Sequence, residues 1–306
     1  MANASPPYHL PVLLGPVLVA ARGARRVVDA TLGDGGHAEG LRSTGAEVLG
    51  IDRDPEAIAI SQRRLGTTGM QYLQAPYASP EALDAVARFR PDFILFDLGV
   101  SSRQLDEESR GFTFRPGAPL DMRMGGSGQT AADLLNHADG AALERIFRDY
   151  ADERRARRLA AEIVRRRDRR HFATSDDLVN AIRAALGPKS GPGDFARLFQ
   201  ALRIAVNDEL GGLERSLPQF RDALVPGGRL AVITYHSGED RLVKQAFRDW
   251  ARRCVCPPEI PVCICRGRAL GRLDPAKPVQ PDASEVATNP RARSAKLRSF
   301  VVDATA

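Results

Sequence analysis

The chain has 306 residues, of which 43% are hydrophobic and 27% charged, and its formal net charge is +6 at pH 7. This length predicts about two domains, and the hydrophobic content is that of a soluble globular protein with a real core. The most apolar early stretch, residues 10–21, contains Pro11 and Pro16 and is too short to span a bilayer. We therefore expect a cytoplasmic protein with no membrane span and no signal peptide.

The basic residues are almost all arginine: 40 of the 44 are Arg. The planar guanidinium suits phosphate groups and stacks on bases, so this composition favours a polyanionic partner. A genome rich in G and C would also raise the arginine content everywhere. Composition does not separate the two explanations, and the distribution of arginine along the chain has to decide.

A glycine-rich segment, residues 27–37 (V-V-D-A-T-L-G-D-G-G-H), has the pattern of a strand, a tight loop and the start of a helix. Gly33, Gly35 and Gly36 suit a loop that takes positive φ and lets a ligand approach the backbone. The helix start then favours an anionic group on that ligand. The spacing Gly-x-Gly-x-x-Ala, ending at Ala38, predicts an adenosine-type ligand without choosing between a nicotinamide dinucleotide and S-adenosylmethionine.

Two further candidates for this ligand follow the next two strands. The strand at residues 47–51 ends at Asp52, at the distance from the glycine loop where a βαβ unit has its ribose-binding carboxylate. A third strand and its loop occupy residues 72–77. Tyr77 at the end of this loop would cover an adenine ring or would be an ordinary half-buried tyrosine.

The fourth strand, residues 92–96, is a nearly continuous apolar run that is followed directly by Asp97. In an open α/β sheet, ligands bind at the carboxyl ends of the strands. Asp97 is therefore a candidate for a role beside the cofactor. The alternative is that it only caps the turn that follows.

The pattern turns helical between residues 134 and 186, which predicts an insertion between the fourth and fifth strands. From Ala156 to Val164 apolar residues recur at helical spacing, and nine arginines fill most of the positions around them. We interpret the arginines as a phosphate-binding face rather than as a merely solvated one. They are Arg154, Arg155, Arg157, Arg158, Arg165, Arg166, Arg167, Arg169 and Arg170.

The other elements are predicted from caps and apolar runs. His236 follows one of these strands and would be either a substrate contact or a structural residue. The elements are a helix at 55–65 capped by Asp54, a long helix at 195–217, a fifth strand at 229–234, a helix at 241–252 started by Ser237 and Asp240, and a closing strand at 296–302.

All the cysteines lie in one C-x-C-x6-C-x-C segment, as Cys254, Cys256, Cys263 and Cys265. Such a cluster could hold a structural zinc ion, although the usual knuckle spacing is C-x2-C, and a disulfide is disfavoured in the cytoplasm. We leave a structural zinc open and predict no metal among the residues of the active site.

Short motifs with a common resemblance are spread along almost the whole chain. They are residues 29–37, D-L-G-V-S-S at 97–102, Q-L-D at 104–106, R-G-F-T-F at 110–114, P-L-D-M-R-M at 119–124, F-Q-A-L-R-I at 199–204, P-G-G-R-L at 226–230, H-S-G-E-D-R-L-V-K at 236–244, and 289–298. Together they resemble the bacterial MraW (RsmH) family. Its members are S-adenosylmethionine-dependent methyltransferases that act on N4 of a cytidine in 16S ribosomal RNA.

The resemblance implies an α/β fold with a Rossmann-like class I methyltransferase sheet and a helical domain inserted between the fourth and fifth strands. Residues 1–108 would form the first part of the methyltransferase domain, and residues 109–198 a mostly helical substrate-recognition domain. Residues 199–306 would complete the methyltransferase domain. The implied cofactor is S-adenosylmethionine, and the implied partner is 16S rRNA in the small ribosomal subunit, with no membrane. Whether the chain forms a homodimer stays open.

The resemblance also implies roles for single residues. Asp97 would be catalytic, because a carboxylate can accept a hydrogen bond from the cytosine amine and hold its lone pair toward the methyl group. A base leaving its stack would lie against aromatic side chains. The candidates for that contact are Phe112, Phe114 and Tyr235, and the cofactor-binding residues would be Gly35, Gly36 and His37 at the methionine end, Asp52 on the ribose, Tyr77 near the adenine, and Asp97 and Gln104 at the reacting end.

Some positions depart from the family pattern. The chain has Ala75-Pro76-Tyr77 where Gly-x-Phe is usual, Gly193-Asp194 in place of His-Pro, and Gly238 where a larger apolar residue is usual. Two other functions remain as alternatives: a nicotinamide-dependent oxidoreductase, which the glycine spacing permits, and a non-catalytic RNA-binding module on the same fold.

Overall fold

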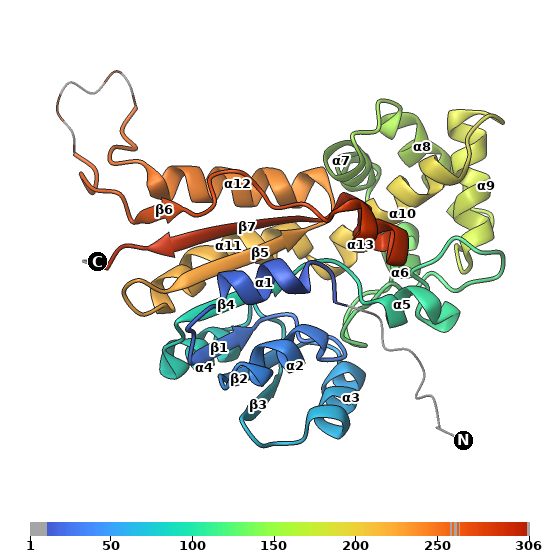
Figure 1. Ribbon diagram of the computed structural model, residues 1–306. Coiled ribbons are helices and arrows are strands. Elements are labelled where there is room, and N and C mark those ends of the chain that lie inside the picture. Colours follow the sequence, from blue (N-terminus) through green and yellow to red (C-terminus); the bar gives the residue numbers. More distant parts are fainter. Residues whose placement is uncertain (1–10, 258, 260–261, 263, 305–306) are drawn as a thin grey trace, which may run out of the picture. The chain divides into compact units, whose positions relative to one another are not determined.

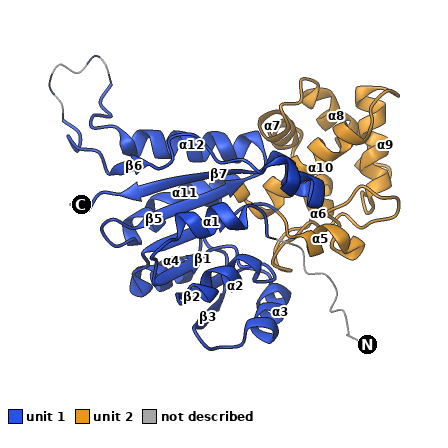
Figure 2. Cartoon of the chain, in the orientation of Figure 1, with its two compact units in different colours: residues 1–99, 210–306 blue, residues 100–209 orange. Residues whose placement is uncertain are grey.

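The computed structural model describes residues 11–257, 259, 262 and 264–304. The chain forms two compact units (Figure 2), one from residues 1–99 with 210–306 and one from residues 100–209. The second unit lies in the chain between the fourth and fifth strands, which confirms the predicted insertion. Among the described residues, no helix combines the length and the apolar character needed to cross a membrane.

The first unit is built on a mixed sheet with the strand order β3-β2-β1-β4-β5-β7-β6 (Figure 1). The first five strands of that order are parallel, and β7 is antiparallel to both β5 and β6. Strand order reverses between β1 and β4, and in open α/β sheets this switch point is where ligands bind. The strands are β1 Arg26–Asp29, β2 Glu47–Asp52, β3 Met70–Gln74, β4 Phe93–Asp97, β5 Arg229–Thr234, β6 Gly271–Leu273 and β7 Lys296–Val302.

Helices cover both faces of this sheet, because side chains of a strand alternate between the two faces. In β4, Phe93 and Leu95 join a core cluster with Val17, whereas Ile94 and Phe96 join the opposite cluster. The helices of this unit are α1 Leu14–Ala20, α2 Gly36–Ser43, α3 Pro55–Leu65, α4 Pro80–Phe89, α11 Glu209–Ala223, α12 Ser237–Ala251 and α13 Ala283–Thr288, with a 3-10 turn at Pro290–Ser294.

The second unit is helical and has its own hydrophobic core, which includes Phe147, Leu159 and Leu202. The segment predicted as the inserted domain, 109–198, falls inside this unit. The unit also takes in residues 100–108, which were predicted to belong to the methyltransferase domain, and the end of α10, because Phe199 and Leu202 pack into its core. Its helices are α5 Ser102–Asp106, a 3-10 turn at Glu108–Arg110, α6 Ala131–His137, α7 Gly140–Ala151, α8 Ala156–Arg167, α9 Ser175–Leu186 and α10 Pro192–Asn207.

The single long helix predicted for residues 195–217 is wrong, because α10 ends at Asn207 and α11 starts at Glu209. Asp208 between them takes a left-handed conformation, with φ at 50°. The Asn207 side chain donates to the Met122 carbonyl (2.7 Å) and accepts from the Met124 N–H (2.9 Å). This break depends on contacts distant in the sequence, which helical spacing does not reveal.

The predicted start of the helix after the fifth strand is also wrong. The cap is His236, whose ring nitrogen faces the Glu239 N–H, and not the pair Ser237 and Asp240. Glu239 in turn accepts from the Tyr235 N–H at 2.8 Å, so α12 begins at Ser237. The predicted helix at 55–65 and strands at 229–234 and 296–302 are confirmed with those bounds.

Candidate functional site

Three neighbouring parallel strands each end in an aspartate. Asp29 is the last residue of β1, Asp52 of β2 and Asp97 of β4. Because β1 pairs in parallel with both other strands, these three carboxyl groups lie at the same edge of the sheet, beside the switch point. The sequence predicted Asp52 and Asp97 at this edge but no role for Asp29.

The glycine loop between β1 and α2 has the backbone that its composition predicts. Gly33 and Gly35 have positive φ values of 52° and 82°. A Cβ on Gly35 would lie 2.9 Å from side-chain atoms of both Leu65 and Ser61, so α3 occupies the space that a side chain would need. The Ser61 hydroxyl donates to the Gly33 carbonyl at 2.9 Å. The loop is therefore held against α3, and only glycine fits at position 35.

Asp52 binds the same loop from the neighbouring strand. One carboxylate oxygen accepts from the Gly33 N–H and the other from the Asp54 N–H, both at 2.8 Å. Burial raises the pKa of Asp52 to about 6, while these two backbone bonds act in the opposite direction. Each oxygen keeps a further lone pair, so the carboxylate can still accept from a ribose hydroxyl.

Asp29 is the functional candidate that sequence reasoning missed. Its side chain is 1% exposed, and Oδ1 accepts only a long bond of 3.3 Å from the Thr31 N–H. Oδ2 is buried and has no hydrogen-bond partner among the described residues. Burial raises the pKa of Asp29 to about 6. A buried carboxylate oxygen without a partner is costly, and a cationic ligand at this edge would relieve the cost.

Asp97 lies between a tyrosine and a histidine. Its Oδ1 accepts from the Tyr235 hydroxyl at 2.8 Å, and its Oδ2 lies 3.5 Å from His37 Nδ1. The Asp97 N–H donates to the Thr31 hydroxyl at 2.6 Å, which holds the end of β4 against the glycine loop. Burial raises the pKa of Asp97, and both the charge of a protonated His37 and the Tyr235 bond oppose that rise.

The hydroxyl of Tyr235 holds the Asp97 carboxylate, a contact that the sequence did not predict. Burial, followed by the charge of Asp97, raises its pKa well above 10, so the hydroxyl stays protonated and donates. Its backbone is held by the buried Glu239 carboxylate at the start of α12. The prediction that its ring stacks on a base stays a prediction.

His37 is 5% exposed at the first turn of α2, and its Nε2 lies 2.9 Å from the Val12 carbonyl oxygen. Since a carbonyl only accepts, Nε2 carries the proton of that bond. In a neutral ring, Nδ1 is then an acceptor that faces the Asp97 carboxylate. This pair therefore offers two acceptors to a hydrogen-bond donor on a ligand.

Tyr77 lies in the loop after β3 and is half-buried. Its ring meets Phe96 edge to face, with centroids 5.2 Å apart. A Cβ on Gly212 would lie 3.9 Å from the Tyr77 hydroxyl. These contacts fix the position of the ring, and its predicted contact with an adenine stays a prediction.

Gln104, Phe112 and Phe114 belong to the second unit. The Gln104 side chain is buried and accepts from the Ser101 N–H at 3.0 Å in the capping box of α5. Phe114 packs edge to face on Phe195 and Phe199, with centroids 5.9 and 6.0 Å apart. Phe114 is thus partly used in the core of its unit, and the predicted roles of all three residues stay predictions.

Most arginines of the arginine-rich helix have partners inside the second unit, which the sequence did not predict. Arg155 donates to the Leu186 carbonyl at 2.7 Å, and Arg167 donates to the carbonyls of Leu135 and Ala138 at 3.1 and 2.6 Å. These bonds satisfy carbonyl groups at the ends of α9 and α6. Arg158 donates more weakly to the Ala184 carbonyl, at 3.5 Å.

Two more arginines neutralise a neighbour on their own helix. Arg165 and Arg166 both bind Glu162, and their hydrogen bonds and charges lower the pKa of Glu162 to about 2. Arg170 lies 3.9 Å from Asp177. Within the described part of the chain, Arg154, Arg157 and Arg169 are exposed and have neither a hydrogen bond nor an ion pair from their side chains. Partners within the unit therefore engage most of these arginines, and the phosphate-binding face stays a prediction.

Comparison with known proteins shows to which family the chain belongs. Residues 7–302 match the model of the MraW methylase family. The chain is 56% identical over 298 residues to the ribosomal RNA small subunit methyltransferase H of Gemmatimonas aurantiaca, covering 96% of this chain and 95% of that protein. The proteins of the same name from Rubrobacter xylanophilus and Heliobacterium modesticaldum are 48% and 45% identical, each over 95% of this chain and 94% and 97% of their own lengths. The chain therefore belongs to the MraW methylase family.

Proposed function

We propose that this chain transfers the methyl group of S-adenosylmethionine to the exocyclic N4 of a cytidine in 16S ribosomal RNA, with Asp97 as the residue that orients the amine. Its family makes it a methyltransferase, and the relatives named above are ribosomal RNA small subunit methyltransferases. The observation that carries the role of Asp97 is its place at the end of β4, held by Tyr235 and next to the glycine loop.

The residues of the strand edge fit a positively charged cofactor. Asp29, Asp52 and Asp97 bring three carboxyl groups to one edge, and burial raises the pKa of each. Three carboxyl groups in one place favour a cationic ligand and disfavour a negatively charged pyrophosphate. This arrangement therefore favours S-adenosylmethionine over a nicotinamide dinucleotide. When bound, S-adenosylmethionine supplies a methyl group activated by its sulfonium. Asp29 would face a cationic group of the cofactor, and Asp52 would accept from its ribose.

We assign the contacts of Gly35, Gly36 and His37 from their position at the start of α2, and those of Tyr77 and Gln104 from the family resemblance. Gly35 and Gly36 give the backbone close access at the start of α2, and His37 with Asp97 offers acceptors to the methionine end. Tyr77 would cover the adenine. Gln104 would contact the reacting end, as the family resemblance implies.

Methyl transfer by direct displacement needs a nucleophile held in line, and positioning supplies most of the catalysis. The cytosine amine is a poor nucleophile because its lone pair is delocalised into the ring. Asp97 keeps acceptor capacity beyond its bond to Tyr235, so its carboxylate can accept from the amine and hold the lone pair toward the methyl group. Tyr235 positions the carboxylate by donating to it and does not react itself.

The direct test is Asp97→Asn, which keeps the shape of the side chain but removes its charge. We expect turnover with small-subunit RNA to fall by about 100-fold or more, because the loss of one oriented group of this kind costs that much. The matched control is Asp92→Asn, at the residue just before β4, where the carboxylate accepts from the N–H groups of Arg25 and Arg26. That variant should lose some stability but keep its turnover.

The readout is the transfer of labelled methyl groups to 16S RNA, with mass spectrometry to locate the methyl group on the base. Turnover of Asp97→Asn within about threefold of the unchanged protein would rule out the proposed role. A methyl group on a ring carbon or on the ribose would rule out the N4 assignment while leaving the methyltransferase activity in place.

We further propose that the substrate is the RNA within the small ribosomal subunit in the cytoplasm and that Arg154, Arg157 and Arg169 contact its phosphates. Among the described residues, the side chains of these three exposed arginines have neither a hydrogen bond nor an ion pair, so they can bind an external anion without breaking one. Methylation of naked 16S RNA at the same rate as of small subunits would contradict the first part. A homodimer is tested by sedimentation at the concentrations used for activity.

A further inference from the structure

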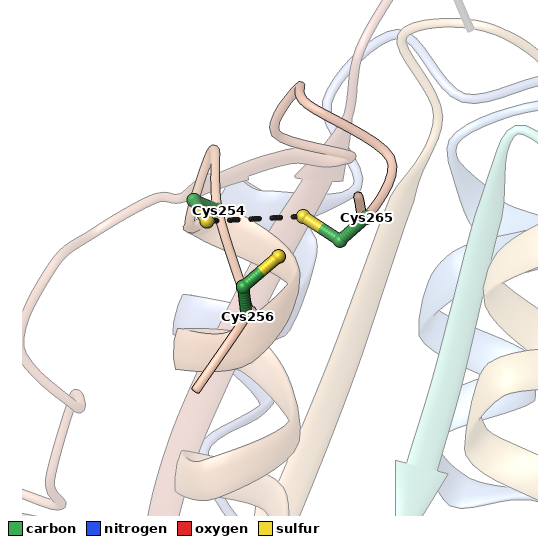
Figure 3. Close-up of side chains that lie close together, drawn as sticks. All are labelled: Cys254, Cys256 and Cys265. Carbon is green, nitrogen blue, oxygen red and sulfur yellow. Dashed lines mark hydrogen bonds between the residues drawn. The ribbon is translucent and has the colours of Figure 1, made fainter. Parts of the chain in front are cut away.

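The loop between α12 and β6 brings three cysteine side chains together, well apart in the chain from the residues assigned above. Cys254 and Cys256 follow the end of α12, and Cys265 precedes β6. Their three sulfur atoms lie within 4.8 Å of one another. Figure 3 shows the three thiols pointing toward a common centre. The fourth cysteine of the chain, Cys263, lies outside the described residues.

The spacing of the sulfur atoms fits a metal ion better than a disulfide. A tetrahedral zinc ion with Zn–S bonds of about 2.3 Å separates its sulfur ligands by about 3.8 Å. The sulfurs of Cys254 and Cys265 are 3.9 Å apart. A disulfide would require about 2.0 Å, and none of these three cysteines is in a disulfide.

The protein holds the two ends of this loop in place without any metal. The Arg266 guanidinium donates to the carbonyls of Asp249, Trp250 and Arg252 at the end of α12, and the Leu270 N–H donates to the Trp250 carbonyl at 2.8 Å. Arg266 is the neighbour of Cys265, so these bonds bring that thiol back to the first two. The geometry of the cluster is thus largely prepared before an ion binds.

The backbone also supports a negatively charged sulfur. The Val255 N–H, between the first two cysteines, points at the Cys265 sulfur at 3.4 Å. An N–H directed at sulfur stabilises the thiolate, which is the form that binds metals. Arg252, Arg253, Arg266 and Arg268 lie close in sequence, and their charges would offset the negative charge of a metal bound by several thiolates.

We propose that Cys254, Cys256 and Cys265 bind a structural zinc ion. Soft thiolate ligands in a tetrahedral arrangement select zinc among the abundant divalent ions. The ion would link the segment after α12 to the segment before β6 and close the loop between them. The ion would be structural, since none of its three ligands is among the residues assigned above to the cofactor or the cytidine.

The test uses the full-length protein purified under reducing conditions from cells supplied with Zn²⁺. We expect about one zinc ion per chain by elemental mass spectrometry. Replacement by Co²⁺ should give the absorption bands of a tetrahedral thiolate site. Arginines on both sides of the cysteines offer cleavage sites for trypsin in this loop. Free Zn²⁺ at about 100 times the Kd of the site should slow this cleavage about 100-fold relative to protein kept metal-free with a chelator.

The double variant Cys254→Ser with Cys265→Ser should lose both the metal and the protection from trypsin. The matched control is Val255→Ser, in the same loop, which leaves every cysteine in place and should keep both. Metal-free protein after Zn²⁺ loading with all thiols reduced would overturn the proposal, and so would zinc retained by the double variant. An iron–sulfur chromophore in place of zinc would also contradict it.

Discussion

Removing the Tyr235 hydroxyl with Tyr235→Phe should move the acid limb of the activity profile to higher pH. The hydroxyl donates to Asp97 Oδ1 at 2.8 Å, and this bond stabilises the charged carboxylate against the burial that raises its pKa. A hydrogen bond to a charged group is worth about 1.5–3 kcal/mol. On the acid side, where most Asp97 is protonated, its loss should lower the ionised fraction, and kcat/KM with it, by about 10- to 150-fold.

The assay measures kcat/KM for methyl transfer to small-subunit RNA across the pH range, because this parameter reports the ionisation of the free enzyme. The deficit of Tyr235→Phe should shrink as pH rises and Asp97 ionises again. The matched control is Tyr72→Phe, whose hydroxyl donates to the Gly66 carbonyl at 2.6 Å in the same unit without contacting Asp97. The control should keep the profile of the unchanged protein.

Two outcomes would refute this reasoning. An acid limb that stays at the same pH in Tyr235→Phe would mean that the hydroxyl does not control the charge of Asp97. A uniform loss of activity at every pH, with the limb unmoved, would mean that the phenol acts through shape or through base stacking, which was the role expected from sequence.

Three further predictions concern charge and backbone. Without cofactor and above about pH 6, Asp29→Asn should be more stable than the unchanged protein by up to about 3 kcal/mol. The reason is that burial raises the pKa of Asp29 from 3.8 to about 6. The stability that such an acid contributes is present below about pH 4 and is lost as pH rises through about 6. Urea unfolding at neutral pH and near pH 4 checks this, and equal stabilities at neutral pH would contradict it. Gly35→Ala should destabilise the protein by about 1–3 kcal/mol and weaken cofactor binding in calorimetry. The control is Gly23→Ala, where φ is 81° but nothing lies within 4 Å of the new Cβ, so this variant should lose only the smaller free energy that a left-handed backbone costs an alanine. Replacing Arg154, Arg157 and Arg169 by Ala should reduce the slope of log affinity for RNA against log salt by about 2–3, and Arg165→Ala, which removes an arginine bound to Glu162, should leave the slope unchanged.

The sequence by itself determined the parts of this protein that depend on near neighbours in the chain. Asp54 caps α3 and Pro55 begins it, and positive φ at Gly33 and Gly35 follows from residue types that tolerate it. The apolar run of β4 ends at Asp97, the only residue of that strand that is not fully buried. Each of these features rests on interactions within a few residues, so composition and spacing were sufficient to predict it.

Only the tertiary structure decided which side chains meet across the chain. The Tyr235 hydroxyl reaches Asp97 over a separation of 138 residues, and Arg167 donates to the carbonyl of Ala138, 29 residues before it in the chain. The isolation of Asp29 Oδ2 likewise depends on every element packed around the end of β1. The physical reason is that burial and hydrogen bonding of a side chain are set by whatever packs against it, and helical or strand periodicity carries no information about that partner.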